Sequence, residues 1–264
     1  MANLAQICIF TPSPHKKGDF FMSNLKNRQN SATQIKKIAT AALFAAIAYV
    51  AMLVTSWIKV GFLTFDAKDA VITLAGLLFG PLYALSISLA VALIELITVG
   101  DTGVYGFIMN FLSSAVFSTV CALIYKYKKN IKGAVTGLIA AVLSMTATML
   151  LFNLFVTPFY MKVPTSVVAS MIPSLFLPFN LTKATLNAAI VLILYKPAST
   201  ALKATKVLPS KVVSETEDSE LTVAEKKKKN LKFSLTVTAI GIAVVAICLV
   251  VFFTVLGGTI SFGK

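Results

Sequence analysis

Six apolar runs, each long enough to cross a lipid bilayer as a helix, constrain this chain more than any other feature. They lie near residues 38–58, 81–99, 104–125, 133–157, 171–195 and 233–256. A helix rises about 1.5 Å per residue, so about 20 residues cross the roughly 30 Å hydrocarbon core. A shorter run, residues 70–79, ends at Gly80-Pro81. None of the runs alternates as a barrel strand does. The sequence therefore predicts an all-α integral membrane protein with seven membrane segments.

Charge follows the connections between these runs. The chain carries a net charge of +14, but only 13% of its residues are charged. Basic residues precede the first run and follow the run over residues 104–125, and nine lysines lie from Lys196 to Lys232. Because positive charge gathers in cytoplasmic loops, the N-terminus is predicted to be cytoplasmic and the C-terminus extracellular. Membrane topology explains the basic residues better than binding to nucleic acid does.

Composition also divides the chain into four parts. Residues 1–34 form a polar cytoplasmic leader, in which Met22 is an alternative start, and residues 35–200 form the body of the membrane domain. Residues 201–232 are a charged cytoplasmic linker, and residues 233–264 carry an additional C-terminal transmembrane helix.

Lys183 is unusual because an ammonium group at membrane depth costs about 3 kcal/mol on insertion scales. Counting helical rise from the cytoplasmic ends places Lys183 at about 20 Å, Asn180 at about 24 Å, Asn110 at about 22 Å and Glu95 at about 21 Å. Asn153 lies somewhat higher. These polar groups are therefore expected to meet in the outer half of the bilayer.

The polar groups offer the chemistry of a binding site. Asn180 and Lys183 are three residues apart, so they share one face of a helix, and Asn187 extends that face. Together with Asn153 they match a planar heterocycle that carries carbonyl and ring N–H groups. In the alternative interpretation, the asparagines only join helices and Lys183 pairs with Glu95.

The connection over residues 59–69 is apolar and ends in two carboxylates, Asp66 and Asp69. It is expected to form a lid or wall above the polar cluster. Asp69 is alternatively the cap of a helix that begins at Ala70, because aspartate accepts free N–H groups of a first turn.

The run over residues 171–195 contains two prolines near Asn180, Pro173 and Pro178. They are expected to interrupt the helix and to free backbone groups, as in helices that line membrane cavities. Aromatic residues at the same level either stack on a ligand or form an interfacial belt. They are Phe155, Phe159, Tyr160, Phe176 and Phe179.

The first run is rich in alanine. Ala41 with Ala45, and Ala42 with Ala46, form two overlapping small-xxx-small pairs, which let another helix approach closely. We interpret them as a docking surface, although alanine is also simply a good helix former.

Enzyme motifs are not found in the sequence. It has no phosphate-binding G-x-x-x-x-G-K-[ST] loop, no metal-ligand spacing and no Ser-His-Asp set. Its three cysteines are widely spaced and are interpreted as apolar filler. The chain is thus predicted not to be an enzyme and to hold no metal or cofactor. Any concentrated ligand would need an ion gradient or a partner as energy source.

Four segments together resemble one known family. They are the alanine-rich first run, residues 62–69 with Phe79-Gly80-Pro81, residues 106–111 (Gly-Phe-Ile-Met-Asn-Phe), and residues 178–183 (Pro-Phe-Asn-Leu-Thr-Lys). Over residues 35–200 the chain resembles the substrate-binding S components of energy-coupling factor (ECF) vitamin transporters, especially their riboflavin-binding branch.

The resemblance implies a six-helix S-component bundle in the bacterial cell membrane, with one extra C-terminal helix that departs from the pattern. It also implies a partner complex, in which the first helix docks on a membrane coupling (T) subunit driven by two ABC-type ATPases. Riboflavin is then the transported ligand. The residues expected to contact it are Asn153, Asn180, Lys183, Phe62, Leu63, Phe65, Asp66, Asn110 and Glu95.

Other functions stay open at this point. The ligand is alternatively another vitamin, such as thiamine. From a different class, the chain is an ion-coupled secondary transporter with Glu95 as proton carrier, or a membrane assembly protein that transports nothing.

Overall fold

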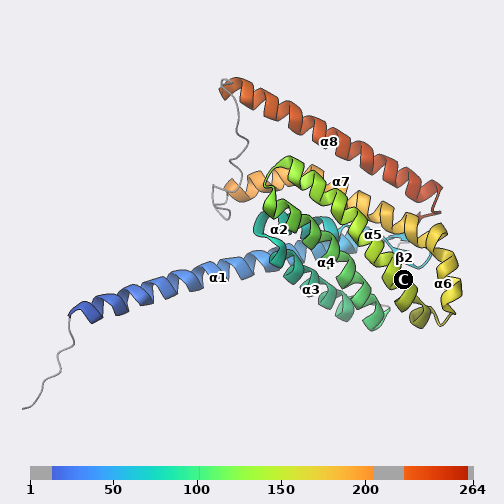
Figure 1. Ribbon diagram of the computed structural model, residues 1–264, viewed down its shortest axis with the longest axis horizontal. Coiled ribbons are helices and arrows are strands. Elements are labelled where there is room, and N and C mark those ends of the chain that lie inside the picture. Colours follow the sequence, from blue (N-terminus) through green and yellow to red (C-terminus); the bar gives the residue numbers. More distant parts are fainter. Residues whose placement is uncertain (1–13, 101, 205–222, 261–264) are drawn as a thin grey trace, which may run out of the picture. The chain divides into compact units, whose positions relative to one another are not determined.

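The computed structural model describes residues 14–100, 102–204 and 223–260. Residues 1–40 and residues 41–264 form two separate compact units, and the bundle described below belongs to the second. The helices are α1 (Pro14–Thr55), α2 (Lys68–Phe79), α3 (Pro81–Thr98), α4 (Gly103–Tyr127), α5 (Ile131–Met161), α6 (Thr165–Met171), the π-helix η1 (Ile172–Phe176), α7 (Leu177–Ala204) and α8 (Val223–Thr254) (Figure 1). The strands are β1 (Ile58–Val60), β2 (Leu63–Thr64) and β3 (Thr259–Ile260).

The short helix α2 is the core of the bundle. Its residues are hydrophobic on every side, and a helix of this kind is stable only when other helices surround it. Residues from Ile72 to Leu78 are all buried, and α3, α4 and α7 pack around α2. With 12 residues, α2 is about 18 Å long, too short to cross a bilayer. It ends at Gly80, and Pro81 opens α3, where its missing N–H costs nothing.

Five helical stretches within the described residues are long and apolar enough to span a membrane. They are Gln34–Thr55, Pro81–Thr98, Gly103–Tyr127, Ile131–Met161 and Thr165–Ala198. The all-α membrane architecture is therefore confirmed, but fewer spans reach this length than the seven expected. Of the other two, α2 is short, and α8 contains the shorter apolar stretch Thr238–Thr254.

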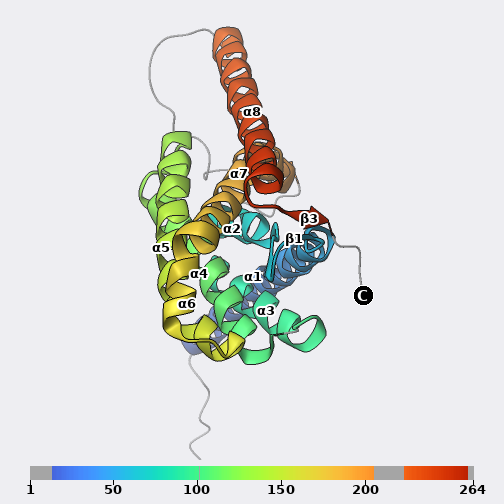
Figure 2. The same cartoon turned by 90° about the vertical axis from the view of Figure 1, so that its right-hand side faces the viewer.

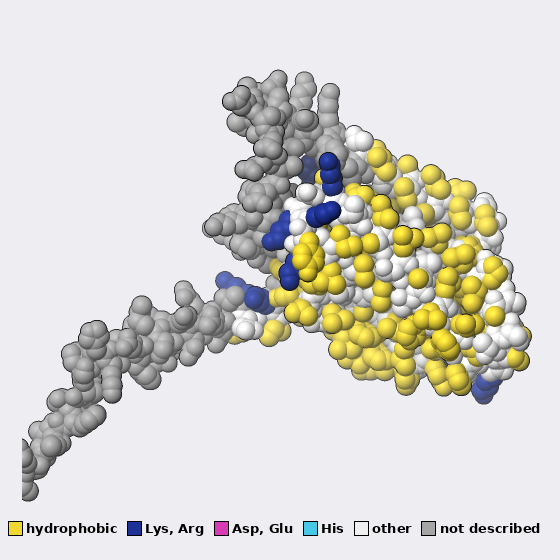
Figure 3. Space-filling view, in the orientation of Figure 1, with side chains coloured by type: hydrophobic (Ala, Val, Ile, Leu, Met, Phe, Trp, Pro, Cys, Tyr) yellow, Lys and Arg dark blue, Asp and Glu magenta, His cyan; other side chains and the backbone are white. Residues whose placement is uncertain are grey.

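The outer surface of the bundle is apolar, as a lipid-facing surface must be. Figure 3 shows hydrophobic side chains over most of the visible face of the bundle, with basic side chains gathered at one end. Large apolar residues on this surface include Leu82, Ile97, Phe155 and Phe159. The lysines of the connection between α4 and α5, such as Lys129, are also exposed.

The predicted interruption of the run over residues 171–195 is a π-helical turn. The turn η1 carries Pro173 and joins α6 to α7 without a gap. Pro178 lies in the first turn of α7, where a missing N–H is tolerated. The helix is therefore distorted at this level and not broken, and Asn180 follows directly after the distortion.

A small antiparallel sheet covers one end of the bundle, and the sequence analysis did not predict it. β1 pairs with β2 through Lys59↔Thr64 and Val60↔Leu63. β3 pairs with the other edge of β1 through Ile58↔Ile260 and Lys59↔Thr259. Figure 2 shows β3 beside β1, after α8 has returned along α7. β3 therefore lies against the connection between α1 and α2.

The predicted linker, residues 201–232, falls largely outside the described residues. α7 runs to Ala204 and α8 begins at Val223, ten residues before the start expected from hydropathy.

Replacing Phe117 with alanine is expected to lower the free energy of unfolding by about 3–5 kcal/mol, because it leaves a cavity in the core. Phe117 is completely buried in the cluster that joins α2, α4, α5 and α7. Thermal unfolding in detergent checks this, with the lipid-facing Phe155→Ala as a size-matched control. Equal loss of stability in both variants would contradict the assigned core.

Candidate functional site

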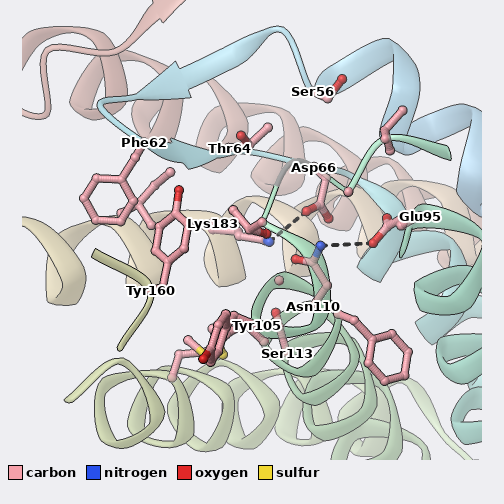
Figure 4. Close-up of a pocket in the computed structure, with 18 of the residues that line it drawn as sticks. Ser56, Phe62, Thr64, Asp66, Glu95, Tyr105, Asn110, Ser113, Tyr160 and Lys183 are labelled. Atoms are coloured by element: carbon pink, nitrogen blue, oxygen red, sulfur yellow. Dashed lines mark hydrogen bonds and ion pairs between the residues drawn. The ribbon is translucent and has the colours of Figure 1, made fainter. Parts of the chain in front are cut away.

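A cavity of about 520 Å³ opens at the end of the bundle that carries the sheet. Its walls come from the end of α1, the β1–β2 hairpin, α3, the start of α4, the end of α5 and the start of α7. Figure 4 shows its polar and aromatic side chains pointing inward from these elements. Ligand pockets for small molecules occupy about 300–1,000 Å³, so the cavity has the size of a small-molecule site.

The ion pair between Lys183 and Asp66 lies in the cavity wall. The Lys183 Nζ is 2.9 Å from the Asp66 Oδ2, and both side chains are buried (Figure 4). Asp66 lies in the connection between β2 and α2, whereas Lys183 lies on α7. The pair therefore ties two segments that are 117 residues apart in the sequence.

Asn187 strengthens the same connection. Its Nδ2 donates to the backbone carbonyls of Asp66 at 3.0 Å and Lys183 at 3.1 Å. Its Oδ1 accepts a hydrogen bond from the backbone N–H of Ala70 at 3.0 Å. Asn187 is completely buried and lies outside the cavity wall. It fixes the entrance to α2 against α7, although the sequence analysis placed it in the polar stripe of the site.

Lys68 is a cavity residue that the sequence analysis missed. It is 1% exposed, and its Nζ lies 2.7 Å and 2.9 Å from the two carboxylate oxygens of Glu95. It also lies 3.4 Å from Asp66. Asn110 donates to Glu95 at 3.1 Å. The suggested pairing of Glu95 with Lys183 is therefore wrong, because Lys68 occupies that position.

The buried charges do not balance. Three carboxylates (Asp66, Asp69, Glu95) face two ammonium groups (Lys68, Lys183). The Oδ1 of Asp66 is buried without a hydrogen-bond partner. Burial acts to raise the pKa of the Asp66 carboxyl, but the nearby charges of Lys183 and Lys68 hold that pKa below its usual range. Asp66 is thus a carboxylate with one oxygen available for a further donor.

Asp69 does not cap α2, as one interpretation of the sequence had it. The helix begins at Lys68, and the capping position is Ala67, which makes no side-chain capping bond. The carboxylate of Asp69 instead accepts hydrogen bonds from Ser113 and Ser114 of α4. Asp69 therefore joins α2 to α4.

Asn153 and Asn180 both lie in the cavity wall, as the depth count suggested. The Nδ2 of Asn153 donates to the Met149 carbonyl at 2.7 Å, and that of Asn180 donates to the Phe176 carbonyl at 2.8 Å. An amide nitrogen carries two hydrogens, so each residue keeps one further donor. The carbonyl of Asn153 accepts a bond from Thr157 at 3.0 Å. Both amides are held in place by their own helices.

Aromatic residues surround the polar groups, though not all those expected. Phe62, Tyr105, Phe107 and Tyr160 line the cavity, and the ring of Phe62 contacts that of Phe176 edge to face at 5.9 Å. Phe179 also lines it, whereas Phe155 and Phe159 face outward.

Among the hairpin residues expected to contact the ligand, Phe62 and Leu63 line the cavity. Phe65 is buried behind it, against α8.

This donor set suits a planar organic ligand more than a metal ion. Among the described residues there is no group of three or more His, Cys, Asp and Glu side chains that is able to hold a metal ion. The cavity instead combines ammonium and amide donors, a carboxylate acceptor and aromatic walls, which together match a flat ring with polar edges and a hydroxylated chain.

Comparison with known proteins identifies related sequences and structures. Residues 36–195 match the family described as "ECF transporter, substrate-specific component". The chain is 31% identical over 185 residues to the riboflavin transporter RibU of Staphylococcus aureus (strain TCH60), which covers 67% of this chain and 97% of that protein. It is also similar to a solved structure described as "Structure and mechanism of the S component of a bacterial ECF transporter". The TM-score is 0.55 with 30% identity, covering 64% of this chain and 99% of the other.

Removing the charge of Lys68 alone is expected to be costly, because it leaves the Glu95 carboxylate buried without its cation. Lys68→Met should lower the free energy of unfolding by about 3–5 kcal/mol. The double variant Lys68→Met with Glu95→Gln should recover much of that loss. Thermal unfolding of Lys68→Met, Glu95→Gln and the double variant gives a double-mutant cycle. Strictly additive losses in the free energy of unfolding would show that the two residues are not coupled.

Proposed function

Because the chain belongs to the family of ECF transporter substrate-specific components, we propose that it is the riboflavin-binding membrane subunit of an ATP-driven vitamin uptake transporter. The family is a transporter component and not an enzyme. The observation that carries the choice of riboflavin is the cavity of about 520 Å³, in which one lysine and two oriented asparagines face aromatic walls. The similarity to a riboflavin transporter over nearly its whole length supports the same choice.

The flavin ring matches the donors near α7. One edge of the ring carries two carbonyl groups and a ring N–H. Lys183, Asn153 and Asn180 present N–H donors from adjacent helices, and Phe62 and Tyr160 lie on the cavity wall beside them. An ammonium group has three donors, so Lys183 keeps its bond to Asp66 while it binds a ring carbonyl.

The carboxylate network next to Lys183 suits the ribityl chain. Glu95 and Asn110 line the cavity there and offer acceptors for hydroxyl groups. Hydrogen bonds to charged partners contribute about 1.5–3 kcal/mol each, so a few such contacts support tight binding. A site built in this way also rejects analogues without the hydroxyl groups, because its own polar groups would be left unpaired.

We further propose that α1 docks on a membrane coupling subunit driven by two ATPases. The structure separates the two alanine pairs of this helix. Ala45 is buried against α2 and α3, and Ala41 is partly buried there, whereas Ala42 and Ala46 are exposed. The exposed pair therefore offers the close approach that another helix needs.

The proposed orientation puts the N-terminus in the cytoplasm and the cavity at the outer face. In this orientation the lysines of the α4–α5 connection are cytoplasmic, as the distribution of positive charge favours.

Uptake in whole cells distinguishes the proposed energy source from ion coupling. Uptake that survives ATP depletion but collapses with an uncoupler, and that fails in Glu95→Gln, would overturn the ATP-driven mechanism.

The ligand itself is tested by mass spectrometry on the purified protein and by quenching of riboflavin fluorescence. Co-purified riboflavin and saturable quenching are expected. Protein that carries no flavin and quenches no added riboflavin would exclude the proposed ligand. A thermal-shift panel of vitamins, with thiamine among them, would then identify another one.

Lys183→Ala is expected to weaken riboflavin binding by about 10–100-fold, because a charge-assisted hydrogen bond is lost. It should also lower the free energy of unfolding, because Asp66 then keeps only the more distant ammonium group of Lys68, at 3.4 Å. Fluorescence titration measures the affinity, and the exposed Lys129→Ala is the matched control. A folded Lys183→Ala protein with unchanged affinity would remove Lys183 from the site.

Ala46→Leu is expected to reduce uptake in cells severalfold while riboflavin binding to the isolated protein stays unchanged, because a larger side chain keeps a partner helix at a distance. Val54→Leu, at another exposed position of α1, serves as control. Equal uptake by both variants would argue against docking through Ala46.

A further inference from the structure

The C-terminal segment, α8 with β3, lies outside the part of the chain that matches the family, which ends at residue 195. This segment nevertheless contacts the wall of the cavity. β3 pairs with β1, and the β1–β2 hairpin lines the cavity through Phe62, Leu63 and Thr64. A structure that belongs to this chain and not to the matched family region therefore contacts the wall of the binding site.

We propose that α8 and β3 hold the β1–β2 hairpin in place over the cavity, and that Phe252 is the positioning residue that sets how long a bound flavin stays. The proposal concerns residence time and rests on the proposed function for its ligand. Whether α8 and β3 keep the hairpin in place does not depend on which ligand binds.

The hairpin is too short to be stable alone. β1 has three residues and β2 has two, and they pair through Lys59↔Thr64 and Val60↔Leu63, with one further backbone hydrogen bond from the Phe65 N–H to the Ile58 carbonyl at 2.9 Å. An isolated two-stranded hairpin is at best marginally stable, and a third strand or packing against a helix is needed to keep it ordered. β3 supplies the third strand, and α8 supplies the packing.

Phe252 is the main contact between α8 and the cavity wall. Its side chain is 1% exposed. Its ring lies 6.3 Å from the ring of Phe65, which follows the hairpin, and 6.3 Å from that of Phe179, which lines the cavity. Val60 of β1 belongs to the same buried cluster. Phe252 does not line the cavity, so it acts on a ligand only through these neighbours.

The path from α8 into β3 is built closely around Phe252. After the helix ends, the N–H of Gly258 donates to the Phe252 carbonyl at 3.1 Å. A Cβ at Gly258 would lie 2.4 Å from the Phe252 ring, so only glycine lets the chain pass there without displacing the ring. The ring is thus enclosed by Phe65, Phe179 and the turn that leads to β3.

α8 also packs closely against α7 at Gly241. Gly241 is buried, and a Cβ there would lie 2.8 Å from the side chain of Ile193 on α7. Small residues at helix contacts in membranes allow such close packing. α8 is therefore packed against the bundle from Gly241 to Phe252, the part of the helix that leads to β3.

A ligand that leaves the cavity past this wall has to displace the hairpin. Displacement breaks the β3–β1 pairing and separates Phe252 from Phe65, so these contacts add to the barrier for release. Removing them is expected to accelerate dissociation more than it accelerates association, because most changes in affinity at one site appear in the dissociation rate.

The test compares three variants of the full chain with the parent protein in detergent. Phe252→Ala removes the ring, Phe252→Leu restores much of the buried volume, and Val250→Ala is the control at an exposed position of the same helix. Amide hydrogen exchange of residues 58–65 in ligand-free protein measures the order of the hairpin. Stopped-flow fluorescence measures riboflavin dissociation.

For Phe252→Ala we expect about tenfold faster exchange in residues 58–65 and about tenfold faster dissociation. Phe252→Leu should lie close to the parent, and Val250→Ala should equal it. A chain ending at Leu256, which lacks β3, should behave as Phe252→Ala does. If Phe252→Ala does not fold, this truncation still tests whether the C-terminal segment holds the hairpin.

Two results would overturn the proposal. Unchanged exchange in residues 58–65 would show that α8 and β3 do not hold the hairpin. Faster exchange with unchanged dissociation would show that the hairpin does not limit release. If the parent protein binds no riboflavin, the proposed function fails, whereas the exchange measurement still decides whether the C-terminal segment holds the hairpin.

Discussion

The buried contact between Asp66 and α7 holds the start of α2 in place at the end of the bundle that carries the sheet. Asp66 bonds to Lys183 through its side chain and to Asn187 through its backbone carbonyl. A charge taken out of water is stable only when it is paired, so neither ion of the pair is free to move alone. As a result, the start of α2 is held against α7, and the hairpin that precedes it is held over the cavity.

The need to pair buried charges also explains why the site is polar at its centre and aromatic around it. Lys68 and Glu95 complete a network in which each ammonium group touches a carboxylate. One carboxylate oxygen of Asp66 stays without a partner, and the two amides of Asn153 and Asn180 each keep a donor. A folded protein rarely leaves buried polar atoms unpaired unless a ligand or water satisfies them. These polar groups support the proposed binding of a polar ligand.

Much of this site was predictable from helical geometry. Lys183, Asn180 and Asn153 were placed together because rise per residue is constant, and all three line the cavity. Lys68 was missed because it stands between two acidic residues in a connection, where a surface position is the ordinary expectation. Phe65 was expected in the cavity but lies behind it, because α8 packs there and draws its ring away.

The sequence by itself determined the helical membrane class, the depth of the polar residues and the family, because these depend on local composition, on a fixed helical rise and on short motifs. Tertiary structure alone decided which charges pair, which alanines stay exposed on α1 and where β3 packs. The pair of Asp66 and Lys183 spans 117 residues, and β3 meets β1 from the far end of the chain. Such contacts depend on the way the helices pack together, and no local pattern of residues records that packing.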